Sequence, residues 1–221
     1  MNLPDNLLPA EWYWYGHVLF AILLIKTIVG APWPRLKNSA SLNLWLGTAV
    51  FVMVIWTIKA GIKPGLNFHL LGATAFTLMF GPHLAIMGLL IVLLGVTLAG
   101  LAGWESFSLN ALLMIVLPVL VTYGIFKIVD RKLPNHFFIY IFLNAFVGGA
   151  LAMTATGLAS TWLLAMADAY SVKHLLEQYL PYYILMAWSE AMATGMIMTL
   201  MVVFRPKWVS TFDDSRYIQN K

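Results

Sequence analysis

The sequence PGLNFHLLGATAFTLMFGP, residues 64–82, is apolar and is bounded by proline and glycine at both ends. It holds a single histidine, His69, shortly after its start. An imidazole nitrogen that faces a membrane interior costs free energy unless something binds it. Either a neighbouring group or a ligand therefore binds His69.

The composition indicates a membrane protein. The chain has 221 residues, of which 61% are hydrophobic and 10% charged, and its mean hydropathy is +0.83. Soluble domains are about 25% charged. We therefore expect one all-α domain over residues 1–221, a polytopic transmembrane helical bundle in the cell (inner or plasma) membrane. Cysteine is absent, which excludes disulfides, thiolate metal sites and cysteine nucleophiles.

Apolar runs separated by turn residues predict about seven spans, since each span needs about 20 residues. The expected ranges are 13–30, 42–60, 66–82, 84–103, 109–129, 136–166 and 180–204. The sixth range holds Gly148, Gly149 and Gly157, which allow a kink or a re-entrant loop. Residues 1–12 form an N-terminal lead toward an outer-face site, residues 13–204 the bundle, and residues 205–221 a frayed cytoplasmic tail.

Lysine and arginine gather on one side of this predicted bundle. That side holds Arg35, Lys37, Lys127, Arg131, Lys132, Arg205, Lys207, Arg216 and Lys221, and the other holds Lys59, Lys63 and Lys173. Because cytoplasmic loops carry the basic residues, the C-terminus is expected in the cytoplasm and the N-terminus outside. His17 and His69 then lie near the outer face. The net charge of +4 thus follows from topology and does not indicate nucleic-acid binding.

Two polar residues in the spans each have two interpretations. Glu190 lies deep in the last span. It is either a helix-packing residue that forms a hydrogen bond with Ser189 or Asn144, or a residue with a role in transport or coupling. His17 lies among Trp12, Tyr13, Trp14 and Tyr15. Such a cluster is typical of an interfacial aromatic belt, but an imidazole there could share a metal with His69.

Three stretches together resemble the CbiM/NikM family, the membrane-embedded substrate-capture components of energy-coupling-factor (ECF) importers for cobalt and nickel. The opening MNLPDNLLPAEW is similar to that family's Met-His-Ile-Pro-Asp-Gly-Phe-Leu-Pro and its following tryptophan. HLLGA, residues 69–73, resembles its His-Leu-Leu-Gly block, which Gly81-Pro82 and a helix with Asn110 follow. The third stretch is SEAMATG, residues 189–195, together with Arg205-Pro206. It resembles the closing Glu-Ala, Thr-Gly and Arg-Pro signature of the family.

The resemblance implies a metal site made of the N-terminal amine, the second residue and the block histidine. In this chain these are Met1, Asn2 and His69, so an asparagine stands where the family has a histidine. An amide oxygen is a weaker ligand than imidazole for late transition metals. Three outcomes are open: His17 replaces the lost ligand, the site has changed its ion toward zinc or copper, or the fold remains without the site.

The implied function is non-enzymatic uptake of a divalent transition-metal ion, cobalt or nickel, with no prosthetic group. The chain lacks the G-x-x-x-x-G-K-[ST] phosphate loop, so ECF ATPase subunits and a transmembrane coupling subunit are the expected partners. The residues that match the closing signature are Glu190, Thr194, Gly195, Arg205 and Pro206. The last two, at the cytoplasmic end, are candidates for docking the coupling subunit.

Three other classes are weaker. An accessory membrane protein could keep the fold without transporting anything. An intramembrane hydrolase is disfavoured, because neither H-E-x-x-H nor G-x-S-x-G occurs. A bis-histidine haem protein would use His17 and His69 as axial ligands.

Overall fold

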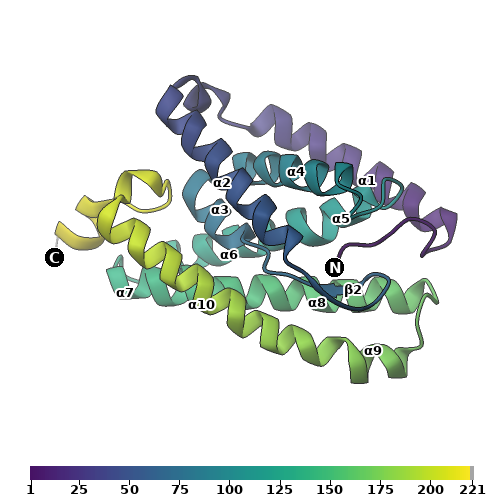
Figure 1. Ribbon diagram of the computed structural model, residues 1–221. Coiled ribbons are helices and arrows are strands. Elements are labelled where there is room, and N and C mark those ends of the chain that lie inside the picture. The colour runs from purple at the N-terminus through teal and green to yellow at the C-terminus, as the bar shows by residue number, and fades with distance from the viewer. Residues whose placement is uncertain (220–221) are drawn as a thin grey trace.

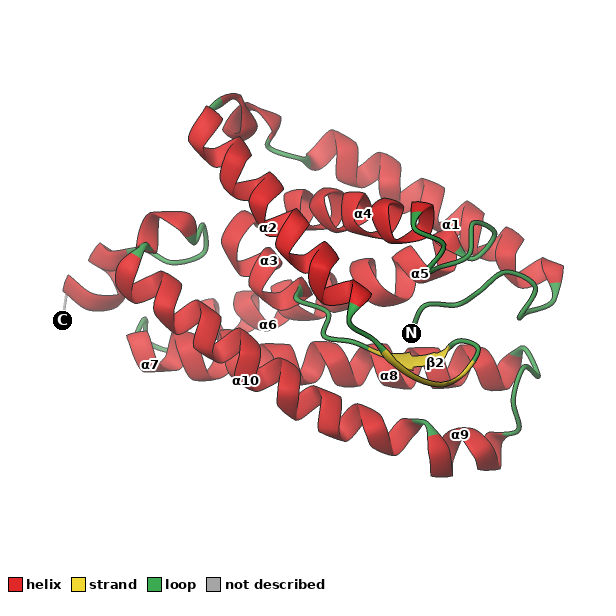
Figure 2. Cartoon of the chain, viewed as in Figure 1, coloured by secondary structure: helices red, strands yellow, loops and turns green. Residues whose placement is uncertain are grey.

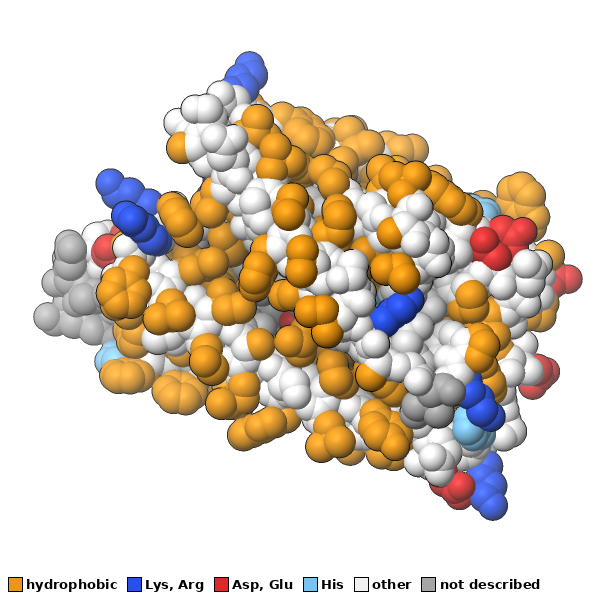
Figure 3. Space-filling view, in the orientation of Figure 1, with side chains coloured by type: hydrophobic (Ala, Val, Ile, Leu, Met, Phe, Trp, Pro, Cys, Tyr) orange, Lys and Arg blue, Asp and Glu red, His pale blue; other side chains and the backbone are white. Residues whose placement is uncertain are grey.

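Long apolar helices make up most of the computed structural model, which describes residues 1–219 (Figures 1 and 2). Helices satisfy their own backbone groups, as a lipid environment requires. Within the described residues, five helical segments are long and apolar enough to cross a membrane: Ala10–Gly30, Ser39–Thr57, Phe107–Lys132, Phe137–Met166 and Val172–Phe204. Large apolar side chains cover the middle of the surface in Figure 3, and most charged side chains lie toward its ends.

The elements follow one another with short connections. In chain order they are α1 (Ala10–Gly30), η1 (Trp33–Lys37), α2 (Ser39–Thr57), β1 (Ala60–Lys63), β2 (Leu66–Phe68), α3 (Ala73–Phe80), α4 (Pro82–Leu98), α5 (Phe107–Ala111), η2 (Leu112–Val116), α6 (Leu117–Lys132), α7 (Phe137–Ile139), η3 (Tyr140–Val147), α8 (Gly148–Met166), α9 (Val172–Gln178), α10 (Leu180–Phe204), η4 (Pro206–Trp208) and η5 (Ser215–Gln219). The antiparallel hairpin β1–β2 was not expected from the sequence.

The expected third span, 66–82, is wrong. Residues 66–68 belong to the hairpin, and α3 has only 8 residues, all buried. At 1.5 Å per residue it is about 12 Å long, whereas a bilayer core is about 30 Å thick. Gly72 and Gly81, with φ of 65° and 80°, end the helix on either side. The expected break at Gly81-Pro82 is confirmed, but the count of seven spans is not.

Helices α8 and α10 approach each other closely at glycines. A Cβ on Gly149 would lie 3.2 Å from the Glu190 carbonyl oxygen, and a Cβ on Gly157 would lie 2.4 Å from Tyr183 Cγ. Small residues let helix backbones approach this closely in membrane proteins. The sixth predicted span is a continuous helix, Phe137–Met166, and is not re-entrant. Its first part, η3, is π-helical.

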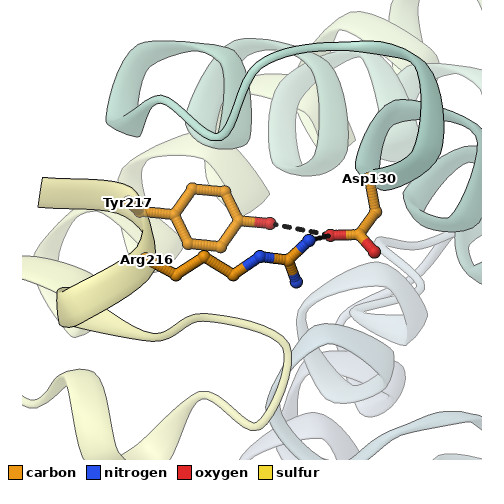
Figure 4. A network of polar contacts seen from close by, with 3 residues as sticks. All are labelled: Asp130, Arg216 and Tyr217. Carbon is orange, nitrogen blue, oxygen red and sulfur yellow. Dashed lines mark hydrogen bonds and ion pairs between the residues drawn. The ribbon is translucent and has the colours of Figure 1, made fainter. Parts of the chain in front are cut away.

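The C-terminal segment is docked, not frayed as the sequence suggested. Ser210 N–H donates to the Met79 carbonyl at 3.0 Å, so the segment binds the end of α3. Figure 4 shows its last turn against α6: Arg216 Nη2 lies 2.8 Å from Asp130 Oδ1, and the Tyr217 hydroxyl donates to the same oxygen at 3.4 Å. Residues 220 and 221 of the predicted tail lie outside the described residues.

Gly157→Ala should destabilise the protein, because the new Cβ would lie within the contact distance of the Tyr183 ring. Overpacking of this kind costs about 1–3 kcal/mol. Thermal unfolding in detergent should show a clear fall in midpoint temperature. Gly124→Ala is the matched control, because nothing lies within 4 Å of its new Cβ. Equal midpoints for the two variants would contradict the close α8–α10 contact.

Candidate metal centre

The N-terminus of the chain lies inside the protein. Met1 and Asn2 have exposed fractions of 1% and 2%, and Figure 1 shows the N-terminal end next to β2. A buried chain start needs partners for its amine and for each peptide group. The residues that supply these hydrogen-bond partners make up the candidate metal centre.

Two asparagine side chains bind the backbone of the lead. Asn67 accepts from Asn2 N–H at 3.0 Å and donates to the Asn2 carbonyl at 3.2 Å. Asn110 accepts from Leu3 N–H at 2.8 Å and donates to the Leu3 carbonyl at 3.1 Å. Each side chain thus replaces one paired position of a β-ladder, because a primary amide offers the same donor and acceptor as a peptide group. No local sequence pattern indicates this role for either residue.

The lead is fixed further along by Asp5. Its carboxylate accepts from the three backbone N–H groups of residues 104–106, at 3.0, 2.8 and 3.3 Å. The Ser106 hydroxyl donates to the Pro4 carbonyl at 2.7 Å. Charged acceptors form the stronger hydrogen bonds. Hydrogen bonds at residues 2 and 3, and again at residues 4 and 5, therefore hold the lead in place and fix the position of Met1.

The Met1 amine lies among three oxygens. It donates to the Gly65 carbonyl at 3.1 Å, to Asn67 Oδ1 at 3.0 Å and to the Asn67 carbonyl. Burial lowers the pKa of this amine well below its ordinary value, and the nearby charge of Lys59 lowers it further. Once uncharged, the amine keeps two N–H donors for these three oxygens and has a lone pair that can serve as a metal ligand.

His69 is held in one tautomer. Its Nδ1 lies 2.9 Å from the Leu70 carbonyl, and because a carbonyl only accepts, Nδ1 carries the proton. Burial lowers the pKa of His69 to about 3, although the Leu70 hydrogen bond acts in the opposite direction. The ring is therefore neutral, and Nε2 presents a lone pair. Metal-binding histidines commonly donate their other ring N–H to a backbone carbonyl in this way.

The Nε2 lone pair faces a second acceptor, Asn2 Oδ1, at 3.0 Å. The orientation of this amide follows from its other end, where Nδ2 lies 3.4 Å from the Leu101 carbonyl. Lys59 Nζ donates to the same carbonyl at 2.9 Å. Ligands bound at right angles about 2.0–2.1 Å from one ion lie about 3 Å apart, so the pair fits two neighbouring ligands of a cation.

Glu190 holds the loop that follows His69. Its two carboxylate oxygens accept from Leu71 N–H at 2.7 Å and Gly72 N–H at 2.8 Å, at the start of α3. A negative charge is favourable at a helix N-terminus. Trp56 Nε1 donates to the Leu71 carbonyl at 3.0 Å from the opposite side, on α2. The loop is thus held between α2 and α10.

The partners suggested for Glu190 from the sequence were wrong. Ser189 donates instead to the Leu185 carbonyl at 3.0 Å. Asn144 has no hydrogen-bond partner among the described residues. Glu190 packs against the backbone of a loop 118 or 119 residues away in sequence, which no local pattern indicates.

His17 is not brought to this centre. Its Nδ1 lies 2.8 Å from Ser108 Oγ, and with Trp14 and Glu105 it lines a separate surface cavity of about 440 Å³. Both nitrogens of His69 face other groups, Leu70 and Asn2. The geometry therefore does not support His17 as the replacement ligand or as the second axial ligand of a haem.

The remaining residues of the closing signature lie away from the lead. Thr194 and Gly195 pack α10 against α8 and η3. Arg205 ends α10 and lies over the Trp208 ring, 5.8 Å from its centroid, and Pro206 begins η4. Within residues 1–219, no group of three or more His, Cys, Asp or Glu side chains could hold a metal. Around His69, the candidate donors are the Met1 amine and the Asn2 amide.

Comparison with known proteins gives the family. The family model described as the cobalt uptake substrate-specific transmembrane region, CbiM, matches residues 2–208. The chain belongs to the CbiM family. The predicted resemblance is thereby confirmed. Because this is a family of transport components, the expectation that the chain is not an enzyme is confirmed as well.

Individual relatives agree with this assignment. The chain is 24% identical over 160 residues to the cobalt transport protein CbiM of Clostridium cellulovorans and 27% identical over 163 residues to that of Moorella thermoacetica. Each match covers 72% of this chain but only 61% of the relative. The chain therefore spans less than two thirds of the length of these CbiM proteins.

Solved structures share the fold. A chain described as a truncated transition metal transporter superposes with a TM-score of 0.77 at 19% identity, covering 92% of this chain and 99% of that one. A second transition metal transporter gives 0.74 at 19% identity, covering 91% and 92%. The helical membrane fold predicted from composition agrees with both.

Glu190→Gln should loosen the His69 loop. One backbone N–H would keep an acceptor, but the other would face the new side-chain NH₂ group. An unpaired buried donor costs about 1–3 kcal/mol. Thermal unfolding should show the loss, and metal affinity should fall about 10-fold or more, as when the support of a ligand is removed.

Ser189→Ala is the matched control, since Ser189 is exposed and bonds only within its own helix. If Glu190→Gln matched this control in stability and in metal affinity, the hydrogen bonds between Glu190 and residues 71 and 72 would have no part in forming the centre.

Proposed function

We propose that the protein is the membrane-embedded substrate-binding component of an ECF-type importer for a divalent transition-metal ion, cobalt or nickel. The ion binds at the outer face between the Met1 amine, Asn2 and His69. The observation that carries the proposal is the pair of acceptors, His69 Nε2 and Asn2 Oδ1, which face each other at 3.0 Å beside the buried amine.

The donor set favours late first-row metals. Two nitrogens and an amide oxygen suit cobalt, nickel, copper and zinc better than magnesium or calcium, which prefer oxygen alone. The amide oxygen at position 2 binds such ions less strongly than the imidazole that the resemblance implies. The centre should therefore release its ion more readily than a site with two imidazoles.

Transport needs energy from other chains. ECF ATPase subunits and a transmembrane coupling subunit supply it in this proposal. Arg205 and Pro206, at the inner end of α10 in the N-outside topology, offer a basic and rigid docking position for the coupling subunit. The protein itself spans the inner or plasma membrane several times, and the lipid bilayer surrounds its apolar sides.

Two observations favour a second function. Asn2 stands at the position of the family histidine, and the Met1 amine already donates to three oxygens. An accessory membrane protein that kept the fold but lost the metal would show the same contacts. Metal binding separates the two functions.

His69→Ala should abolish metal binding. The untagged protein, purified with its native N-terminus, should hold one equivalent of cobalt or nickel, or of zinc or copper, by mass spectrometry. The variant should hold none, because the neutral Nε2 is the strongest side-chain ligand of the centre. His17→Ala is the matched control and should keep the metal, since His17 binds Ser108.

Asn2→His completes the design. An imidazole at this position should raise affinity for nickel and cobalt about 10-fold or more, because nitrogen ligands suit these ions better than an amide oxygen. Absence of metal in the native protein, together with binding by Asn2→His, would support the accessory function. Loss of metal in His17→Ala but not in His69→Ala would place the site elsewhere.

A further inference from the structure

A cavity of about 440 Å³ lies on the side of the bundle, between α2 and α10 and against α3 (Figure 1). Its lining is almost entirely apolar and includes Phe51, Ile55, Ala75, Met79, Ile197 and Met201. Phe51 is 56% exposed, and α2 and α10 both belong to segments that can cross a membrane. The cavity therefore opens toward the hydrocarbon of the bilayer. None of the proposed metal ligands lines it.

Two polar side chains of the lining form their hydrogen bonds inside the protein. Both carboxylate oxygens of Glu190 accept from backbone N–H groups, and this residue is only 1% exposed. The Thr48 hydroxyl donates to the Leu44 carbonyl at 2.8 Å. Neither side chain needs a polar ligand, so the length of the cavity suits an apolar one.

The dimensions of the cavity fit a single hydrocarbon chain. Along α10 its lining extends from Glu190 to Met201, which is about 16 Å at 1.5 Å per residue. The hydrocarbon core of a bilayer is about 30 Å thick, so one leaflet contributes about 15 Å. A volume of about 440 Å³ spread over that length is too narrow for an α-helix, which is about 10 Å across or more with its side chains.

Two arginines lie beside one end of the cavity. Arg35 Nη2 donates to the Met79 carbonyl at 3.3 Å, and the Arg205 guanidinium lies 5.8 Å from the centroid of the Trp208 ring. Met79 and Trp208 both line the cavity. Within residues 1–219, neither guanidinium is paired with a carboxylate. Both can therefore bind an anion such as a phosphate group.

We propose that this cavity binds one anionic phospholipid, with an acyl chain along α3 and the phosphate group beside Arg35 and Arg205. In the N-outside topology this end lies at the cytoplasmic leaflet, where anionic lipids are enriched. The acyl chain reaches Leu70 and Gly72, in the loop that follows His69. This inference goes beyond the proposed function and does not depend on metal transport.

The headgroup must decide which lipid binds. An acyl chain gains little hydrophobic free energy when it moves from the bilayer into an apolar cavity, because lipid tails are as apolar as leucine. Charge-assisted hydrogen bonds to the phosphate group are stronger than neutral ones. A lipid with a net negative charge should therefore bind in preference to a zwitterionic lipid with the same acyl chains.

Gly47→Phe tests the cavity. Gly47 lines it, and nothing lies within 4 Å of a Cβ at this position, so the new ring can enter the cavity. The protein is purified in a mild detergent, offered equal amounts of phosphatidylglycerol and phosphatidylcholine, and measured by native mass spectrometry. The native protein should hold one phosphatidylglycerol, and Gly47→Phe should lose it because the phenyl ring takes the place of the acyl chain.

Gly124→Phe is the matched control and should keep the lipid. Gly124 also has nothing within 4 Å of its new Cβ, but it lies on α6, outside the lining of this cavity. Thermal unfolding shows whether each variant is folded. If Gly47→Phe does not fold, Ala193→Phe carries the same test from α10, since Ala193 also lines the cavity.

Arg35→Gln tests the headgroup. Its preference for phosphatidylglycerol over phosphatidylcholine should fall about fivefold, because each basic residue near an anionic membrane surface contributes about that factor. Arg131→Gln removes the same charge from an exposed position on α6 and should leave the preference unchanged. Arg35 lies outside the docking position suggested for the coupling subunit, so this result is independent of the proposed function.

Three results would overturn the inference. One is equal retention of phosphatidylglycerol by Gly47→Phe and Gly124→Phe, and another is equal binding of the two lipids by the native protein. The third concerns a partner chain. With benzoylphenylalanine in place of Phe51, irradiation of cells of the native host should give a phospholipid adduct, whereas an adduct with another protein would show that a partner covers the cavity.

Discussion

The pairing of two asparagine side chains with the backbone of the lead is the interaction on which the rest of the centre depends. Asn67 and Asn110 make residues 2 and 3 part of the interior, as neighbouring strands would. Without this pairing the buried peptide groups would lack partners, and the lead would leave the protein. The amine of Met1 and the amide of Asn2 would then lose their positions beside His69.

The short length of α3 follows from the same arrangement. A helix that began at residue 66 would replace the hairpin, whose residues 65 and 67 bind the start of the lead. The loop of His69 follows the hairpin, and Trp56 and Glu190 hold the loop from α2 and α10. The Glu190 side chain thus accepts hydrogen bonds from the backbone N–H groups of residues 71 and 72.

The sequence predicts the parts of this protein that depend on local pattern. Apolar runs of sufficient length give the long helices, and Gly81-Pro82 gives the break after α3, because both are properties of neighbouring residues. The expected span 66–82 failed because its apolar residues are buried in protein, and hydropathy does not distinguish protein from lipid. His69 is a candidate from sequence alone because a lone histidine in an apolar run is conspicuous. Asn67, Asn110 and Asp5 were missed as functional residues, since their partners lie 65 or more positions away.

X-ray absorption spectroscopy of the cobalt-loaded, untagged protein tests the centre most directly, because it reports the atoms bound to the ion. We expect a first shell of nitrogen and oxygen at about 2.0–2.2 Å, with the outer-shell scattering of a single imidazole. Scattering from two or more imidazoles, or from sulfur, would contradict it, since His69 is the only histidine that the structure brings to the Met1 amine among the residues described.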